Sequence, residues 1–340
     1  MSPPRRSILS VGAATALAPG ALSSVLAARA GKLANRSFDL ASDGSKRIGT
    51  TRARRIPDEV VGVERMLRFA APALREAAAG LGLADGARVR VFCALPEPRP
   101  LPEEEEKRLG AGFFEALGRV SELDIDAHRS VAVRIGHAGF ATALELALAA
   151  SGDTPVLVGG VDSYHHPRVL EHLLESKRIL SEDAHGGMVP SEGAAFLAVG
   201  SASQRPALAT IAAQASGKEL PKTWEEPRVA ELLTDLVALS AGPLSARPLG
   251  WVLPDINGER HRAKEWDFCS VRCSDLISPP KTEITRLTEA WGDTGAATGA
   301  LAAVHVVLAW QTGFSPAPHA LLTLASEGDE RGIVALEAPT

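Results

Sequence analysis

The sequence carries an internal repeat that predicts a duplicated fold. The first copy, GHAGFATALELALAASGDTPVLVGGVDS, begins at Gly136, and the second, GDTGAATGALAAVHVVLAW, begins at Gly292. Both copies open with Gly-X-small-Gly at the start of an Ala- and Leu-rich helix, and both continue through a Gly/Pro loop into apolar strands. Such self-similarity predicts two halves related by a pseudo-twofold axis, which we place at residues 1–203 and 204–340.

The repeat places His137 and Asp293 at equivalent positions, at the N-termini of the two matched helices. Helix N-termini present free backbone N–H groups and the positive end of the helix dipole, which suits a nucleophile or an oxyanion. Small residues at both helix starts favour close packing of the two helices: Ala138, Gly139, Ala296, Ala297 and Gly299. We therefore take the two helix starts as the candidate site.

Strands and helices alternate along the rest of the chain. The hydrophobic pattern predicts strands at 7–11, 88–94, 155–159, 194–199 and 207–213. It predicts helices at 19–30, 60–81, 102–123 and 167–180, with Pro72 expected to kink or split the second of them. This order is typical of an α/β fold with largely buried sheets.

Composition restricts the class of protein. Hydrophobic residues make up 45% of the chain and charged residues 23%, which opposes disorder and coiled coil. A net charge of -5 with scattered Lys and Arg opposes a nucleic-acid-binding surface. No apolar run reaches the roughly 18 residues that a membrane-spanning helix needs. The sparse cysteines, Cys93, Cys269 and Cys273, favour a reducing cytoplasm without disulfides.

The N-terminal segment has two interpretations. It contains two arginines, an apolar stretch, and small residues at Ala28 and Ala30, which is a pattern found in twin-arginine export signals. The favoured interpretation is a first strand at 7–11 followed by a helix, because Gly12 and Pro19 interrupt the apolar stretch. We therefore expect a cytoplasmic protein, with export as the alternative.

Four stretches of the chain resemble the motifs of one known family. PVLVGGVDS from Pro155 and PSEGAAFLAVG from Pro190 resemble a strand pair that follows a nucleophile helix, and residues 7–30 resemble a first strand and helix. WGDTGAATGALAAVHVVLAW from Trp291 resembles an Asn-Ile-Gly-His-Thr motif with its small-residue helix, and DINGE from Asp255 resembles a His-Gly-Thr-Gly-Thr loop. The family is that of the β-ketoacyl synthases of the thiolase superfamily, and the resemblance spans nearly the whole chain.

The resemblance implies a thiolase-like five-layered α-β-α-β-α fold, built from the two halves, and acyl-thioester chemistry without a cofactor or metal. It implies a dimer, either a homodimer or a heterodimer with a ketosynthase, in which the strand at 155–163 pairs across the twofold axis. The implied small partners are an acyl carrier protein or acyl-CoA, and neither nucleic acid nor a membrane is expected.

The resemblance also assigns site residues. In the family a cysteine at the start of the central helix takes the acyl group, and two histidines assist decarboxylation and stabilise the carbanion or oxyanion. The motifs align that cysteine with His137 and the two histidines with Asp255 and Asp293. Asn257 and Glu259 belong to the same polar loop as Asp255 and are further candidates.

These replacements alter the chemistry that the site can perform. Condensation needs a low-pKa thiolate, whereas an imidazole forms only a labile acyl-imidazole. Two ionised aspartates repel a developing oxyanion, by roughly 4 kcal/mol per pair at ~4 Å and an effective dielectric near 20. The glycine-rich turn of the family is replaced as well, by EGDERG from Glu327. We therefore expect no standard condensation.

Three functions remain open at this point. The first is a ketosynthase-like protein without condensing activity, acting as a partner subunit or acyl-chain binder, as chain-length-factor subunits do. The second is a divergent acyltransferase or hydrolase that uses His137 as general base with Asp255 or Asp293. A variant of it holds a divalent metal with Glu259 added. The third is a structural or assembly protein with a filled pocket. We favour them in that order.

The remaining histidines and the cysteines are interpreted as structural. His165, His166 and His172 lie at the start of a predicted helix, where a polar loop and helix cap are favoured over a metal cluster. His305 lies in an apolar helix and is interpreted as a hydrogen-bonded core histidine. The three cysteines are interpreted as core thiols.

Overall fold

Alternating strands and helices form an α/β structure, as the sequence predicted. The computed structural model describes residues 6–39, 47–82, 87–110, 112–150, 155–181, 186–201, 205–220, 229–244, 246–279 and 281–339. Within these ranges, no helix combines the length and the hydropathy needed to cross a membrane.

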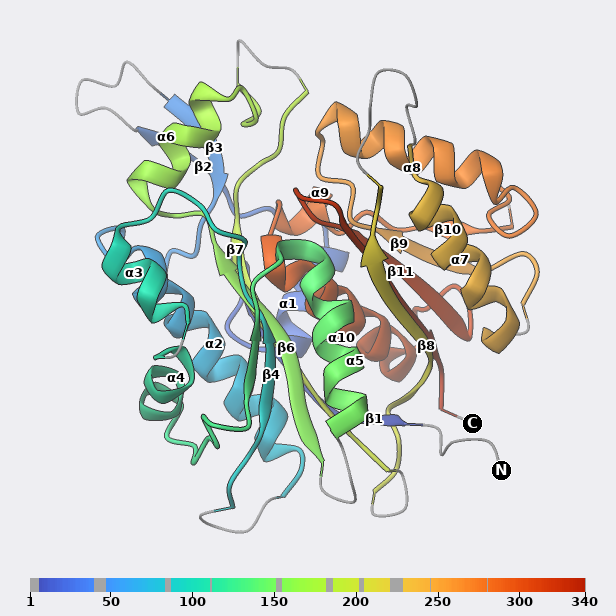
Figure 1. The fold of residues 1–340 in the computed structure, drawn as a ribbon, viewed down its shortest axis with the longest axis horizontal. Helices are drawn as coiled ribbons and strands as arrows, with labels where there is room; N and C mark the ends of the chain where they lie inside the picture. The colour runs from blue at the N-terminus through green and yellow to red at the C-terminus, as the bar shows by residue number, and fades with distance from the viewer. Residues whose placement is uncertain are drawn as a thin grey trace.

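One large mixed sheet organises the molecule (Figure 1). Its strand order is β10-β9-β11-β12-β8-β1-β7-β6-β4-β5. The strands are β1 (Ser7–Thr15), β4 (Val91–Ala94), β5 (Val131–Val133), β6 (Val156–Ser163), β7 (Glu192–Gly200), β8 (Ala209–Lys218), β9 (Trp251–Pro254), β10 (Glu283–Ile284), β11 (His319–Ala325) and β12 (Glu330–Glu337). A separate small sheet pairs β2 (Asn35–Asp39) with β3 (Arg47–Thr51).

The large sheet consists of two half-sheets that meet where β1 lies beside β8. These two strands pair only through Ser7 with Thr210 and Ile8 with Ala209. The strands β1, β4, β5, β6 and β7 lie on one side of this junction, and β8 to β12 lie on the other. Each half-sheet is therefore drawn from one continuous stretch of the chain.

Helices cover both faces of the half-sheets and fill the space between them (Figure 1). Between the half-sheets lie α5 (Gly139–Ala150), α10 (Thr298–Thr312) and α1 (Ala21–Arg29), with short 3-10 turns η1 (Gly136–Ala138) and η2 (Gly295–Ala297) before α5 and α10. The first half-sheet is covered by α2 (Gly62–Ala79), α3 (Glu103–Arg108), α4 (Phe113–Ser121) and α6 (Pro167–Glu175). The second is covered by α7 (Glu231–Leu244) and α8 (Arg260–Arg272), and α9 (Thr288–Trp291) precedes η2.

The central helix α10 is apolar around most of its circumference, and it is surrounded by protein on all sides over most of its length. Every residue from Thr298 to Ala309 is buried, which is the environment that such a helix requires. At Gly299 an added Cβ would lie 2.8 Å from Cβ of Phe140 on α5. The predicted close packing of these two helices is therefore confirmed.

Three element predictions were wrong in detail. Residues 102–123 form two helices rather than one, because the chain turns at Gly110, a poor helix former. Pro72 does not end α2, since the helix packs its apolar face against β1 and β7 on both sides of the proline. The helix predicted at 167–180 ends early, and Lys177 adopts a left-handed φ of 56°.

The strand β6 is interior, which corrects the prediction that residues 155–163 pair across a molecular twofold axis. It is hydrogen-bonded to β4 on one side and to β7 on the other, so it has no free edge. The outermost strand on this side of the sheet is β5, whose only partner among the described strands is β4. Any strand pairing between molecules on this side would use β5.

Candidate functional site

His137 and Asp293 meet between the starts of the two central helices. The Nε2 atom of His137 lies 2.9 Å from Oδ1 of Asp293, and both residues are buried, with 2% and 1% of their surfaces exposed. The 3-10 turn η1 positions His137, and the segment leading into η2 positions Asp293. The helix starts thus bring together the two side chains that the repeat singled out.

The two residues do not occupy equivalent places in the repeat. Gly136 and Gly295 each open a 3-10 turn with a positive φ, 68° and 53°. Matching these turns puts His137 inside its turn and Asp293 ahead of its own. The prediction of equivalence was wrong because it aligned Gly292, rather than Gly295, with Gly136.

Asp293 is held as an anion by several hydrogen-bond donors. Its Oδ2 accepts from Asn257 Nδ2 at 2.6 Å, and its Oδ1 accepts from the backbone N–H of Gly295 at 2.8 Å and from the Tyr164 hydroxyl at 3.4 Å. Burial alone would raise the pKa of Asp293, but His137, Arg262 and Asn257 lower it well below its ordinary value.

His137 is engaged through both ring nitrogens. Opposite Asp293, the Nη2 atom of Arg262 lies 3.4 Å from Nδ1 of the ring. Burial disfavours the imidazolium and Arg262 repels it, but Asp293 outweighs both, so the pKa of His137 is raised. No ring nitrogen is therefore left free to act as a base toward a ligand.

Asp255 orients Arg262 rather than His137. Its Oδ2 accepts from the backbone N–H of Ala325 at 2.7 Å and from Nη1 of Arg262 at 3.3 Å. Burial raises the pKa of Asp255, although Arg262 and His137 act in the opposite direction. Of the two aspartates that the enzyme hypothesis offered as partners of His137, Asp293 is hydrogen-bonded to the ring, whereas Asp255 is bonded to Arg262 and Ala325.

Glu259 belongs to a second ion-pair network around Arg178. Arg178 donates to both oxygens of Glu259, at 2.6 and 2.8 Å, and its Nη2 lies 2.6 Å from Oε2 of Glu327. Glu327 in turn accepts from Arg262 at 2.7 Å, and Asn257 donates to Glu259 at 2.9 Å. Burial alone would raise the pKa of Glu327, but Arg262 and Arg178 lower it to about 2.

Sequence reasoning found the acids of this site and missed its cations. The candidates His137, Asp255, Asp293 and Glu259 carry three carboxylates, which cannot be buried together without positive partners. That imbalance was a usable signal, and Arg262 stands three residues after Glu259 in the same charged segment. Arg178 had no such signal, because only the fold brings it to this place.

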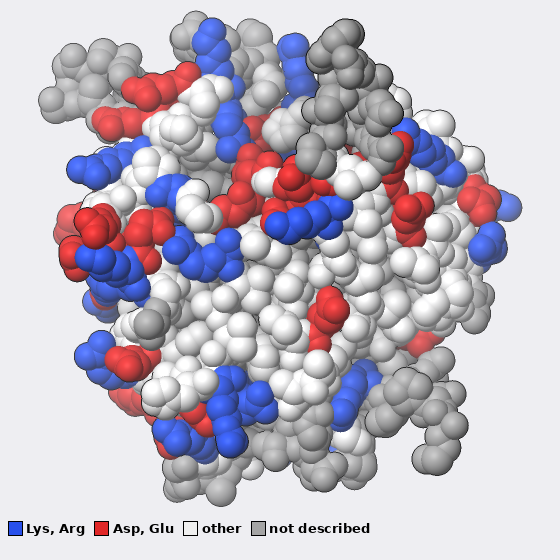
Figure 2. Space-filling model, in the orientation of Figure 1, with Lys and Arg blue, Asp and Glu red and all other residues white. Residues whose placement is uncertain are grey.

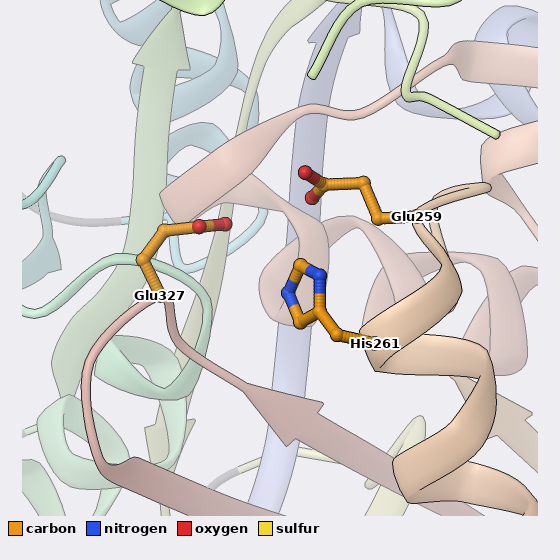
Figure 3. Close-up of side chains that lie close together, drawn as sticks. All are labelled: Glu259, His261 and Glu327. Carbon is orange, nitrogen blue, oxygen red and sulfur yellow. The ribbon is translucent and has the colours of Figure 1, made fainter. Parts of the chain in front are cut away.

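One group of side chains has the composition of a metal site. Glu259, His261 and Glu327 offer ligand atoms within 4.8 Å of one another, and Figure 3 shows the three side chains converging from α8 and the β11–β12 hairpin. Both carboxylates already bind guanidinium groups, those of Arg178 and Arg262. A divalent cation would have to displace these arginines.

A cavity of about 250 Å³ opens beside His137. Its wall includes Pro96, Glu97, Arg99, His137, Tyr164 and Glu327. Among the described residues that line it, none is a cysteine, serine or threonine. The cavity therefore lacks the side chains that usually form an acyl-enzyme.

The three cysteines lie away from this cavity, as the sequence predicted. All three are free and buried. Cys93 is on β4, where burial raises the pKa of its thiol. Cys269 and Cys273 pack in the apolar cluster beneath α7 and α8.

The other histidines have structural surroundings. The Nδ1 atom of His166 accepts the backbone N–H of Arg168 and caps α6, which confirms the prediction of a helix cap. Burial lowers the pKa of His165 to about 4. His305 is buried as predicted, with its ring edge-on to Trp291 at 5.9 Å. No hydrogen bond to its Nδ1 is found within the described residues, so the predicted bond is not supported at that atom.

Comparison with known proteins identifies the fold. No protein-family model matches the sequence, and no curated protein sequence is significantly similar to it. A chain of the complex of a type II polyketide synthase acyl-carrier protein with its ketosynthase (AntDE:AntF) matches with a TM-score of 0.80 and 14% identity over 100% of both chains. The ishigamide ketosynthase/chain length factor matches with a TM-score of 0.76 and 14% identity, over 99% of this chain and 100% of that one.

A β-ketoacyl synthase from Burkholderia phymatum matches as well, with a TM-score of 0.75 and 16% identity over 99% of this chain and 100% of that one. The TM-scores establish that the fold is shared, and identities this low show no more than the fold. The chain therefore has the thiolase-like α/β fold of ketosynthases, and the predicted fold class is confirmed.

Proposed function

We propose that this chain is a ketosynthase-like subunit without condensing activity that acts by pairing with a ketosynthase. The observation that carries the proposal is the closed hydrogen bonding of His137. Asp293 and Arg262 occupy its two ring nitrogens, so the imidazole at the start of α5 has neither a free lone pair nor a neighbouring thiol.

The polarity of the site also supports the absence of condensation. A condensing site needs donors aimed at a developing negative charge. Here the Asp293 carboxylate, whose pKa is lowered, lies beside His137. The nearby donors Asn257 and Gly295 already donate to this carboxylate, so they are not aimed at a ligand. An oxyanion beside Asp293 would be repelled rather than stabilised.

The size and lining of the cavity favour pairing over acyl-chain binding. The described cavity beside His137 measures about 250 Å³, and three charged side chains, Glu97, Arg99 and Glu327, stand in its wall. Between α5 and α10, Phe140 packs against Gly299, so the two helices leave no room for an acyl chain at this contact. Both features suit a subunit whose contribution is structural.

The surface around α5 offers a face for a partner. Leu146 and Ala149 are exposed on α5, Thr142 is partly exposed one turn before Leu146, and β5 has a free edge beside them. Figure 2 shows few charged side chains over this region of the molecule. Depletion of charge is typical of the centre of a protein interface. One of the similar structures is itself a ketosynthase/chain length factor.

The pairing is tested by co-expression with a ketosynthase of the same organism, followed by affinity capture and light scattering. We expect a stable complex, at least ten-fold weaker for Leu146→Asp on the α5 face. Leu239→Asp on α7 is the matched control, because Leu239 is also an exposed helical leucine. Equal capture of both variants, or of neither, would contradict the proposed face.

A catalytic alternative is favoured by the 2.9 Å contact between His137 and Asp293, since such a pair serves as a general base in hydrolases. Incubation with acetyl- and malonyl-thioesters, followed by intact-protein mass and free-thiol measurement, separates the two functions. We expect neither an adduct nor thiol release. Thiol release that disappears in His137→Ala would favour the hydrolase.

A further inference from the structure

The Glu97 carboxylate lies against the β11–β12 hairpin and against Gly136, the residue that precedes His137. Its Oε1 accepts the backbone N–H of Glu327, on the hairpin between β11 and β12, at 2.9 Å. A Cβ added at Gly136, the residue before His137, would lie 2.7 Å from the same oxygen. The backbone N–H of Gly328 also favours the carboxylate form of Glu97.

No cation accompanies this carboxylate among the described ion pairs. The two arginines in the cavity wall are engaged elsewhere, Arg99 with Asp162 at 2.7 Å and Arg178 with Glu259 and Glu327. The pKa of Glu97 is raised by burial and by the Glu327 carboxylate, while the backbone N–H groups of Glu327 and Gly328 and the charge of a protonated His137 oppose the shift. Glu97 is thus an acid held in an unfavourable place by backbone N–H groups.

The backbone keeps Glu97 in this place. Pro96, Pro98 and Pro100 alternate with Glu97 and Arg99 in the segment that follows β4. Each proline restricts its own φ to about −65°, and each also restricts the residue before it. The side chain of Glu97 therefore projects from a stiff segment, which lowers the entropy lost when its carboxylate docks on the hairpin.

We propose that Glu97 is a built-in occupant of a site for small carboxylates, formed by the backbone N–H groups of Glu327 and Gly328 in the cavity beside His137. Successive backbone N–H groups in a turn form a concave site that binds anions. Glu97 supplies the anion from within the chain and closes the site to an external one. This inference goes beyond pairing with a ketosynthase, because it holds whether or not a partner is bound.

The test is an acetate titration at pH 7, read from the backbone amide signals of Glu327 and Gly328 by NMR. In the wild type we expect no saturable shift of these signals. In Glu97→Ala we expect a saturable shift, and its apparent Kd for acetate should be at least ten-fold lower than any Kd fitted to the wild-type titration. Glu104→Ala, on the exposed face of α3, should behave like the wild type.

Glu97→Gln separates the hydrogen bond from the charge, because its amide oxygen can still accept from the Glu327 N–H. We expect this variant to remain closed to acetate. If Glu97→Ala does not fold, Glu97→Asp shortens the reach by one methylene and should open the site. Two results would overturn the proposal. One is a folded Glu97→Ala, or Glu97→Asp where the alanine variant does not fold, that shows no more acetate-induced shift than the wild type. The other is acetate binding of equal strength in that variant and in Glu97→Gln.

Discussion

Arg262 lies on the opposite side of the His137 ring from Asp293, with its Nη2 3.4 Å from Nδ1. Arginine has only donors, so Nδ1 must act as the acceptor when the imidazole is neutral. The proton of the neutral ring is then on Nε2, where Asp293 accepts it. An anion and a cation thus define the tautomer of His137 between them.

Replacing Asp293 by Asn should lower the pKa of His137. Burial and Arg262 lower this pKa and would remain, whereas Asp293 raises it most, with a smaller contribution from Asp255. The pKa should fall below the ordinary value for histidine. An NMR pH titration of the His137 ring, with the exposed His128 as internal reference, measures the change. A pKa that does not fall would show that Asp293 is not the dominant partner.

Replacing Arg262 by Met should shift the same pKa in the opposite direction. Methionine keeps much of the apolar volume of arginine but removes the positive charge that opposes protonation of His137. The His137 pKa should rise above the wild-type value in the same titration. The two variants serve as controls for each other, and shifts of the same sign would contradict the arrangement described here.

The unfolding free energy should depend on pH through this pair. The folded pKa of His137 is raised, so its contribution is fully present below its unfolded value of about 6.5 and is lost as pH rises through the folded value. The folded pKa of Asp293 is lowered, so its contribution is present above about 3.9 and is lost as pH falls toward the folded value. The pair therefore contributes most between roughly pH 4 and 6.5. Urea unfolding of the wild type and His137→Asn, measured from pH 4 upward through the folded pKa of His137, should give unfolding free energies that converge only above about pH 6.5.

Arg178→Ala should destabilise the fold by about 2 kcal/mol, because Glu259 loses both hydrogen bonds from Arg178 and Glu327 loses one of its two arginine partners. Arg247→Ala is the matched control. Arg247 also pairs with an acid, Asp275, but both side chains are more than 60% exposed, so the loss should be below about 0.5 kcal/mol. Urea unfolding measures both, and equal losses would contradict the importance of the Arg178 network.

Gly299→Ala should destabilise by about 1–3 kcal/mol, because the new methyl group would lie 2.8 Å from both Phe140 and Leu324. This cost exceeds the helix-propensity gain of about 1 kcal/mol. At Gly242 on α7, no atom beyond its chain neighbours and its own helix backbone lies within 4 Å of a new Cβ, and because Pro243 follows it, Gly242→Ala should be close to neutral. Thermal unfolding compares the two, and a stabilised Gly299→Ala would show that the interior yields more than the structure implies.

Local patterns were sufficient to predict most elements, and they failed where tertiary contacts override them. The strand at β1 was predicted from its short apolar run, and the central helices were predicted from the Ala- and Leu-rich segments that follow the repeated glycines. Pro72 was expected to kink or split α2, yet the helix runs from Gly62 to Ala79 without a break, packed against the sheet. β6 was expected at a molecular interface, but an apolar strand looks the same whether its neighbours belong to its own chain or to another.

The sequence by itself determined the α/β class, the two central helices and the presence of His137 and Asp293 near their starts, because hydrophobic pattern and composition are local properties of the chain. Only the tertiary structure decided what those residues contact. Arg178, Arg262, Glu97 and Glu327 come from four separate segments, and no spacing rule relates them. Their ion pairs and hydrogen bonds exist because the fold buries several carboxylates in one place, where each requires a donor from whatever part of the chain can reach it.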